Sequence, residues 1–225
     1  MPTSRPRNKL LKIYNILFKH FGPQAWWPAE TPFEVIVGAI LTQNTNWKNV
    51  EKAIANLKAH KLLSPKAILE IRNSKLENLI RPTGYFKQKT KKLKAFVIYF
   101  IREYQGKLGK MRENQGAKLR DELLEVHGIG PETADSILLY ALDKLTFVVD
   151  AYTRRIGNRV GLFRFSGYHE IKEFFEKNLP KDLEMYKEYH ALLVELGKNF
   201  CKTEPLCEDC PIDSICEKKK GLPAC

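Results

Sequence analysis

Apolar residues recur every three or four positions through nearly all of the 225-residue chain. This spacing is typical of amphipathic helices, and it runs through KLLKIYNILFKHF, FEVIVGAILTQ, KQKTKKLKAFVIYFIREY and MYKEYHALLVELGKNF. Gly, Pro, Ser or Asn residues separate the helical stretches, as in FGPQ, HGIGP and FSGY. The one run with β character, LTFVVD, is too short and isolated to form a sheet. The pattern therefore predicts an all-α fold.

The charge balance is strongly basic, with 38 Lys and Arg against 26 Asp and Glu and a net charge of +12. An excess of this size favours a partner that is a polyanion, such as nucleic acid. No apolar run approaches the roughly 20 residues that span a bilayer. Lys19 and His20 interrupt the apolar stretch near the N-terminus, so we expect no secretory signal. The expected location is the cytoplasm, or the nucleoid if the source is bacterial or archaeal.

The segment LLEVHGIGPETADSILLYAL predicts two helices joined by a tight turn. Gly128 and Gly130 allow successive backbone N–H groups to point outward, and Pro131 suits the first position of the second helix. Such a turn binds phosphate without any side-chain charge. A plain turn between helices is the alternative for a bare Gly-x-Gly, but the longer pattern ending in Thr-Ala is more specific.

The segment FVVDAYTRRIGNR follows the hairpin. In this order the two segments resemble the helix-hairpin-helix DNA glycosylases of the endonuclease III superfamily. The resemblance implies that Asp150 is the catalytic carboxylate. Cleavage of an N-glycosidic bond develops positive charge on the sugar, and a fixed carboxylate stabilises that charge. Asp150 also suits the N-cap of the following helix, and both roles can hold together.

One hairpin residue departs from the strand-cutting members of that superfamily. Those members carry a lysine two residues after the second glycine, and its amine forms a Schiff base with the sugar. This chain has Glu132 at the position, and a carboxylate cannot perform that step. The sequence therefore predicts a monofunctional glycosylase without lyase activity.

All five cysteines lie in the last 25 residues. Cys201, Cys207, Cys210 and Cys216 have the spacing C-x5-C-x2-C-x5-C, which suits a zinc ion or a [4Fe–4S] cluster. The superfamily has a closely similar cluster-binding loop, usually with one more residue in the first gap. The resemblance implies [4Fe–4S], with zinc as the alternative. Cys225 is left over as an expected free thiol.

Two further segments resemble the DNA-facing loops of the superfamily. In ILTQNTNW, Gln43 matches a residue that fills the gap left by a flipped-out base, although it could simply face solvent. In RPTGYFKQKTKKLKAF, Tyr85 is the candidate wedge between bases. Lysines that follow it would contact phosphates or solvate the helix; these are Lys87, Lys89, Lys91 and Lys92. The residues expected to contact DNA are Gln43, Tyr85, Gly128, Gly130 and Thr133.

The three tryptophans bear on the substrate. Core packing is the default for Trp26, Trp27 and Trp47, but aromatic rings near a flipped base suit a cationic, alkylated purine. Such a base leaves without a general acid because it already carries positive charge. The combination of WWP, LTQNT and GIGPETADSIL resembles the 3-methyladenine branch of the superfamily. The expected base pocket comprises Trp26, Trp27, Trp47, Glu132 and Lys198.

The resemblance implies two helical domains and a metal loop. Residues 28–144 are expected to form a helical barrel with the hairpin, residues 1–27 and 145–200 a second helical domain, and residues 201–225 an iron–sulfur loop and tail. The expected enzyme is a monomer that acts on double-stranded DNA with a damaged base and binds no membrane.

Several alternative functions are compatible with the sequence. Glu132 disfavours a bifunctional enzyme for oxidised pyrimidines. A mismatch adenine glycosylase usually has a catalytic glutamate where this chain has Gly38. A mismatch thymine or uracil glycosylase stays open, as does a non-catalytic DNA-binding module.

Overall fold

The computed structural model describes residues 4–217, and these form helices and connecting loops without a strand. The α-helices are α1 (Ser4–Phe21), α2 (Pro32–Leu41), α3 (Trp47–Ala59), α4 (Pro65–Glu70), α5 (Asn73–Ile80), α6 (Phe86–Tyr104), α7 (Leu108–Arg112), α8 (Gly116–Glu125), α9 (Pro131–Ser136), α10 (Ala151–Arg159), α11 (Tyr168–Asn178) and α12 (Leu183–Asn199). Short helices of other types are η1 (Arg81–Thr83), η2 (Ile137–Ala141) and η3 (Asp213–Ile215). None of the described helices is long and apolar enough to cross a membrane. The predicted all-α class is confirmed.

The chain divides into two compact units. The continuous unit is Trp27–Lys144 and contains α2 to η2. The split unit combines Met1–Trp26 with Leu145–Cys225, and it contains α1 and α10 to η3. The cysteine-bearing loop after α12 thus belongs to the split unit. Cys225 lies outside the described residues.

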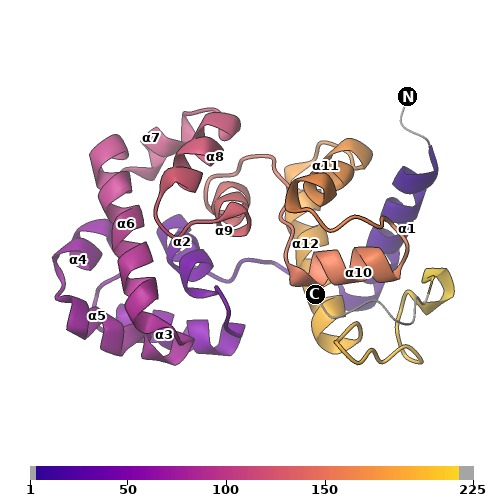
Figure 1. Ribbon diagram of the computed structural model, residues 1–225, viewed down its shortest axis with the longest axis horizontal. Coiled ribbons are helices and arrows are strands. Elements are labelled where there is room, and N and C mark those ends of the chain that lie inside the picture. The colour runs from indigo at the N-terminus through magenta and orange to yellow at the C-terminus, as the bar shows by residue number, and fades with distance from the viewer. Residues whose placement is uncertain (1–3, 218–225) are drawn as a thin grey trace. The chain divides into compact units, whose positions relative to one another are not determined.

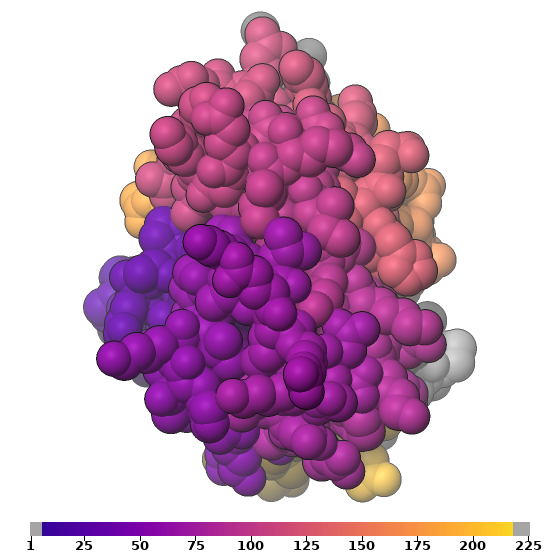
Figure 2. Space-filling model, turned by 90° about the vertical axis from the view of Figure 1, so that its left-hand side faces the viewer, coloured from indigo at the N-terminus to yellow at the C-terminus, as the bar shows by residue number. Residues whose placement is uncertain are grey.

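The continuous unit is built around α2 and α6. Every residue of α2 except Pro32 is buried, and the long α6 packs against α2, α4 and α5 (Figure 1). Apolar side chains such as Ile36, Phe96 and Phe100 are fully buried between these helices. Figure 2 looks onto a face of this unit, where α4 and α5 lie below the end of α6 and α7. The packing fixes the C-terminal end of α2 and the start of α6, beside which the candidate DNA-facing residues Gln43 and Tyr85 lie.

Aromatic rings form much of the core of the split unit. The rings of Phe147 and Phe175 stack with centroids 4.2 Å apart, and Tyr186 and Tyr189 meet Phe147 edge-on. The hydroxyl of Tyr189 donates to the carbonyl of Leu10 at 2.9 Å, which fastens α12 to α1. Offset and edge-on ring contacts stabilise beyond their buried area. This core holds the extended segment that leads into Asp150.

Some details differ from the sequence expectation. Helices α4, α5 and α7 were not foreseen, because segments of five to eight residues are too short to display a helical period. The helix expected after the hairpin changes from α-helical α9 to the π-helical η2 at Ile137. Residues 145–150, the run with β character, are extended but pair with no strand among the described residues.

The packing of α10 against α12 depends on a glycine. A Cβ built on Gly197 would lie only 2.2 Å from Cδ1 of the Tyr152 ring. The helix axes could not approach so closely with any larger residue at this position, since the ring fills the space. This approach brings the start of α10 beside the middle of α12.

We expect Gly197→Ala to lower the free energy of unfolding by about 1–3 kcal/mol, because overpacking outweighs the better helix propensity of alanine. Gly109→Ala is the matched control, since nothing lies within 4 Å of a Cβ there, and it should gain roughly 0.5–1 kcal/mol. Urea denaturation followed by circular dichroism measures both. Equal effects of the two changes would show that the contact with Tyr152 is easily relieved.

Candidate active site

Asp150 is the N-cap of α10. Its backbone is extended (φ −98°, ψ −176°), and its Oδ1 accepts a hydrogen bond from the N–H of Thr153 at 2.7 Å. Val148 and Val149, each 1% exposed, anchor the preceding segment in the core. The sequence Val-Asp-x-x-Thr therefore fixes the carboxylate at a helix start, where the helix dipole favours negative charge.

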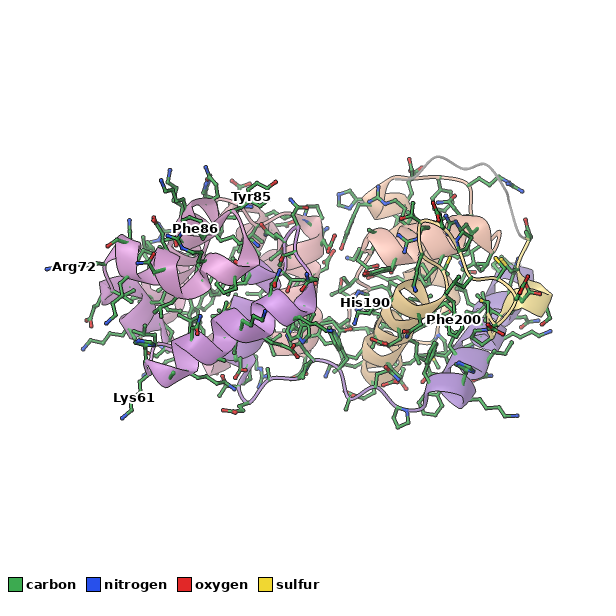
Figure 3. All side chains as sticks on the ribbon, turned by 90° about the horizontal axis from the view of Figure 1, so that it is seen from below. Lys61, Arg72, Tyr85, Phe86, His190 and Phe200 are labelled. Atoms are coloured by element: carbon green, nitrogen blue, oxygen red, sulfur yellow. The ribbon has the colours of Figure 1, made fainter. Side chains whose placement is uncertain are left out.

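The surroundings of Asp150 favour its ionised form. Burial alone would raise the pKa of this carboxyl, but the charge of His190 and the N–H of Thr153 outweigh burial and hold the pKa below its usual value. The Nε2 atom of His190 lies 3.7 Å from Oδ2 of Asp150, an ion-pair distance when the imidazole is protonated. His190 comes from α12 and is 5% exposed (Figure 3).

Sequence reasoning missed His190. A single histidine on the apolar face of α12 is ordinarily a core residue, and only the packing of α10 on α12 places it beside Asp150. The Asp150 side chain is 13% exposed. The arrangement thus presents a fixed, ionised and partly accessible carboxylate, which can stabilise a cation that develops next to it.

Of the two glycines in the hairpin turn between α8 and α9, only Gly128 has a backbone conformation that requires glycine. Gly128 has φ +83°, and a Cβ there would also collide with the stem of Lys92 at 2.2 Å. Gly130 is the N-cap of α9 with extended backbone (φ −94°, ψ 177°). Nothing lies within 4 Å of a Cβ at Gly130, so this side of the turn is open. The open side and the first N–H groups of α9 form a surface that suits an anion.

Glu132 is exposed in the first turn of α9. A carboxylate at this position stabilises the helix through its dipole. This is a structural reason for an acid beside an anion-binding turn.

The side chain of Gln43 lies against the hairpin. Its Nε2 donates to the carbonyl of Gly128 and to Oγ1 of Thr133, both at 3.0 Å. Its Oε1 accepts from the ammonium of Lys92. Thr133 is 6% exposed, so its hydroxyl lies within this network rather than on the surface. The structure thus joins three of the sequence-predicted DNA-facing residues, Gln43, Gly128 and Thr133.

Tyr85 stands on a tight turn before α6 and is 71% exposed (Figure 3). Its backbone is left-handed at φ +45°, after Gly84 at φ +67°. A tyrosine in this conformation costs free energy, and such strain is often found where function fixes a side chain. The lysines that follow differ from expectation, because Lys89 is only 2% exposed. The prediction that Lys89 contacts phosphates or solvates the helix is therefore wrong.

The predicted pocket residues fall into two groups. In the continuous unit, the ring of Trp27 meets Trp47 edge-on at 5.2 Å and Tyr140 at 5.4 Å. Trp27 and Trp47 also line a hollow of about 210 Å³ together with Glu51. In the split unit, the ammonium of Lys198 lies 5.2 Å above the ring of Trp26. Lys198 also pairs with Glu195 at 2.8 Å, a partner that sequence reasoning did not find.

The four spaced cysteines lie in the loop that follows α12. Cys201, Cys210 and Cys216 are half-buried and Cys207 is exposed. Burial raises the pKa of the Cys210 thiol, and a hydrogen bond from the N–H of Ile212 partly offsets this. Nearby charge on the other three cysteines raises the pKa further. The four sulfurs are therefore electrostatic neighbours, and thiolates are the donors that zinc and iron–sulfur clusters take. Nevertheless, within residues 4–217 no three His, Cys, Asp or Glu side chains are arranged as a metal site. The four cysteines are thus present in one loop as expected, but among the described residues they do not adopt the arrangement of a metal site.

Two arginines of α10 fasten the cysteine loop. Nε of Arg155 donates to the carbonyl of Cys201 at 2.8 Å. Arg159 donates to the carbonyl of Thr203 at 2.9 Å and lies 3.5 Å from Sγ of Cys201. The helix that begins at Asp150 thus ends on this loop, so a distortion of the loop would reach the helix that positions the carboxylate.

The family model for HhH-GPD superfamily base excision DNA repair proteins matches residues 37–181. A protein of Methanocaldococcus jannaschii described as a candidate DNA repair glycosylase is 55% identical over 213 residues, which cover 93% of this chain and 96% of that protein. Endonuclease III of Thermotoga maritima is 30% identical over 187 residues, or 83% of each chain. The chain therefore belongs to the HhH-GPD superfamily and is a DNA glycosylase of base excision repair. The predicted superfamily is confirmed.

Solved structures share the fold. The 3-methyladenine DNA glycosylase of H. pylori bound to 1,N6-ethenoadenine has a TM-score of 0.76 and 30% identity, over 86% of this chain and 97% of that chain. A trapped endonuclease III–DNA intermediate has a TM-score of 0.81 at 23% identity, over 94% of this chain and 96% of that chain. At that identity the second likeness concerns the fold alone.

The two roles of the Asp150 side chain can be separated by substitution and pH. Asp150→Asn keeps an oxygen for the N–H of Thr153, whereas Asp150→Ala loses the cap and should cost about 1 kcal/mol more. Because the folded-state pKa of Asp150 lies below its usual value, the carboxylate contributes stability above the usual pKa and loses it as pH falls through the folded pKa. The stability advantage of wild type over Asp150→Asn should thus shrink below about pH 4.

Urea denaturation of the three proteins over a pH series measures these differences. An Asn variant that is more stable than wild type at neutral pH would contradict the account of the Asp150 environment.

Proposed function

We propose that this protein is a monofunctional DNA glycosylase that acts as a monomer on double-stranded DNA. It hydrolyses the N-glycosidic bond of a flipped-out alkylated purine, such as 3-methyladenine, and leaves an abasic site. The observation that carries the proposal is the Asp150 carboxylate, which is fixed as an N-cap and kept ionised by its surroundings. Its position after the hairpin matches the catalytic aspartate of the superfamily.

The chemistry needs little beyond this carboxylate. As the bond between base and sugar breaks, its electron pair leaves with the base and positive charge grows on the sugar. Asp150 stabilises that charge, and water adds to the sugar carbon with loss of a proton. An alkylated purine is positively charged before cleavage and becomes neutral as it leaves, so no general acid is required. His190 acts as a positioning residue that holds the Asp150 carboxylate from the side of α12.

Glu132 supports the monofunctional character. An exposed carboxylate in the first turn of α9 cannot attack the sugar as an amine does, so no Schiff base forms at this position. Glu132 is also a proposed residue of the base pocket.

Aromatic side chains support a purine substrate that carries positive charge. Trp27 is held by Trp47 and Tyr140, and such rings attract cations and stack on flat bases. A side chain at Gly38 would meet the indole of Trp27, 3.1 Å from its Nε1. A glutamate there, as the mismatch adenine rival requires, is therefore disfavoured. The H. pylori relative, solved with 1,N6-ethenoadenine, also favours a modified purine. We also propose that Trp26 and Lys198, which lie in the split unit, contact the base.

The proposed DNA contacts are of two kinds: side chains that enter the base stack and backbone groups that bind a phosphate. Gln43 fills the space left by the flipped base, and Tyr85 wedges between neighbouring bases. Backbone groups of Gly128 and Gly130 grip a phosphate, with Thr133 beneath them. Gln43 must release its hydrogen bonds to Gly128 and Thr133 when it enters DNA. In the free protein these hydrogen bonds thus hold the Gln43 side chain beside the hairpin that is proposed to bind DNA.

Cys201, Cys207, Cys210 and Cys216 would hold a [4Fe–4S] cluster. When bound, the cluster orders the loop and supplies no step of the hydrolysis. Arg155 and Arg159 would then connect the ordered loop to α10 and so to Asp150.

A panel of duplexes tests the substrate. We expect release of 3-methyladenine at a rate well above release of mismatched thymine, uracil or oxidised pyrimidines, and strand cleavage only after alkali. Borohydride should trap no covalent complex on abasic DNA, because position 132 lacks an amine. Efficient trapping would refute the monofunctional reading, and release confined to mismatched or oxidised bases would refute the alkylated substrate.

Metal content tests the cysteine loop. Protein purified without oxygen should be brown and contain about four irons per chain. Cys210→Ser should lower the iron content and the visible absorption, whereas Cys225→Ser, outside the four-cysteine pattern, should change neither. A colourless protein that contains zinc would support the zinc alternative and refute the cluster.

A further inference from the structure

Lys89 is buried in a chain whose other cations mostly face solvent. It is 2% exposed, and its ammonium donates to the carbonyl of Leu41 at 2.9 Å and to the carbonyl of Thr83 at 2.7 Å. Burial and the nearby charge of Lys92 lower its pKa to about 8. A buried ammonium costs free energy unless it is well paired. The two carbonyls supply that pairing, and their places in the chain indicate why a lysine is buried here.

Each carbonyl belongs to a segment that presents a proposed DNA-reading side chain. Leu41 is the last residue of α2, where a helix has unpaired carbonyls and a negative dipole end. Gln43 follows two residues later. Thr83 begins the turn that presents Tyr85 with left-handed backbone at Gly84 and Tyr85. The Lys89 ammonium therefore joins the end of α2 to a strained turn.

Lys92 extends the same arrangement toward the hairpin. Its ammonium donates to Oε1 of Gln43, and its stem occupies the space beside Gly128, where a Cβ would meet it at 2.2 Å. The first two turns of α6 thus contact all three segments that carry the proposed DNA contacts. Lys87 and Lys91 lie on the same turns but are exposed.

We propose that the four lysines in the first two turns of α6 have two different roles. Lys89 and Lys92 are positioning residues that set the turns of Gln43, Tyr85 and the hairpin relative to one another, and they make no phosphate contact in the complex with DNA. Lys87 and Lys91 are the lysines that bind phosphate. This inference rests on the proposed DNA-reading roles of Gln43 and Tyr85.

Methionine substitutions separate the two roles, because methionine keeps an unbranched stem and removes the charge. Lys89→Met and Lys92→Met are compared with Lys91→Met, which removes the same charge from an exposed position of the same helix. Two binding constants are measured over a salt series, one for undamaged duplex and one for duplex with a reduced abasic-site analogue. Fluorescence of 2-aminopurine opposite the analogue reports insertion of side chains into the stack.

Lys89→Met and Lys92→Met should leave binding to undamaged duplex and its salt dependence unchanged. They should lower both the preference for the abasic analogue and the 2-aminopurine response. We expect a loss of about tenfold, rising to about 10²-fold if the Gln43 and Tyr85 side chains are misplaced by about 1 Å. Lys91→Met should weaken binding to both duplexes alike and reduce the salt slope by about one. Circular dichroism confirms that each variant is folded, and Lys92→Met, at a partly exposed site, carries the test if Lys89→Met does not fold.

Two outcomes would overturn the inference. One is that Lys89→Met and Lys92→Met behave like Lys91→Met, and the other is that Lys89→Met reduces the salt slope. These results differ from failure of the proposed function, in which wild type itself would show no preference for the abasic analogue and no base release.

Discussion

The interaction on which the site depends is the hydrogen bond from the Thr153 N–H to the Asp150 carboxylate at the start of α10. It fixes the carboxylate, satisfies an end of the helix and helps to keep the group ionised despite its burial. The close approach of α10 to α12 at Gly197 adds His190 from the other side. The helix cap is thus also the proposed catalytic group, so the local fold and the proposed chemistry share one requirement.

A second requirement concerns the continuous unit, where separate segments must present their side chains together. Helix α6 meets this requirement through buried Lys89, which bonds to the end of α2 and to the Tyr85 turn, and through half-buried Lys92, which bonds to Gln43. The chain is strongly basic, and an exposed lysine is ordinarily a phosphate contact or a solvated charge. Here the bonds from the Lys89 and Lys92 ammonium groups to protein oxygens assign these two lysines to the architecture instead.

The sequence predicted the all-α class, the superfamily and the hairpin, because helical period and turn glycines are local signals. It also predicted Asp150 as an N-cap, which depends on a few neighbouring residues. It did not reveal His190, Glu195 or the buried state of Lys89, since each depends on contacts between segments distant in the chain. Short helices such as α4 and α7 escaped for a different reason, because they contain fewer than two turns. The same local spacing identified four cysteines but could not give their coordination geometry.

The central claim is that an ionised Asp150 carries base release. Single-turnover release of 3-methyladenine by wild type and Asp150→Asn, with duplex affinity measured in parallel, tests it most directly. The account predicts that the Asn variant loses release by several orders of magnitude while its affinity for damaged DNA stays within a few-fold of wild type, because the amide keeps the cap but lacks the charge. Release at nearly the wild-type rate by a folded Asn variant would contradict the claim.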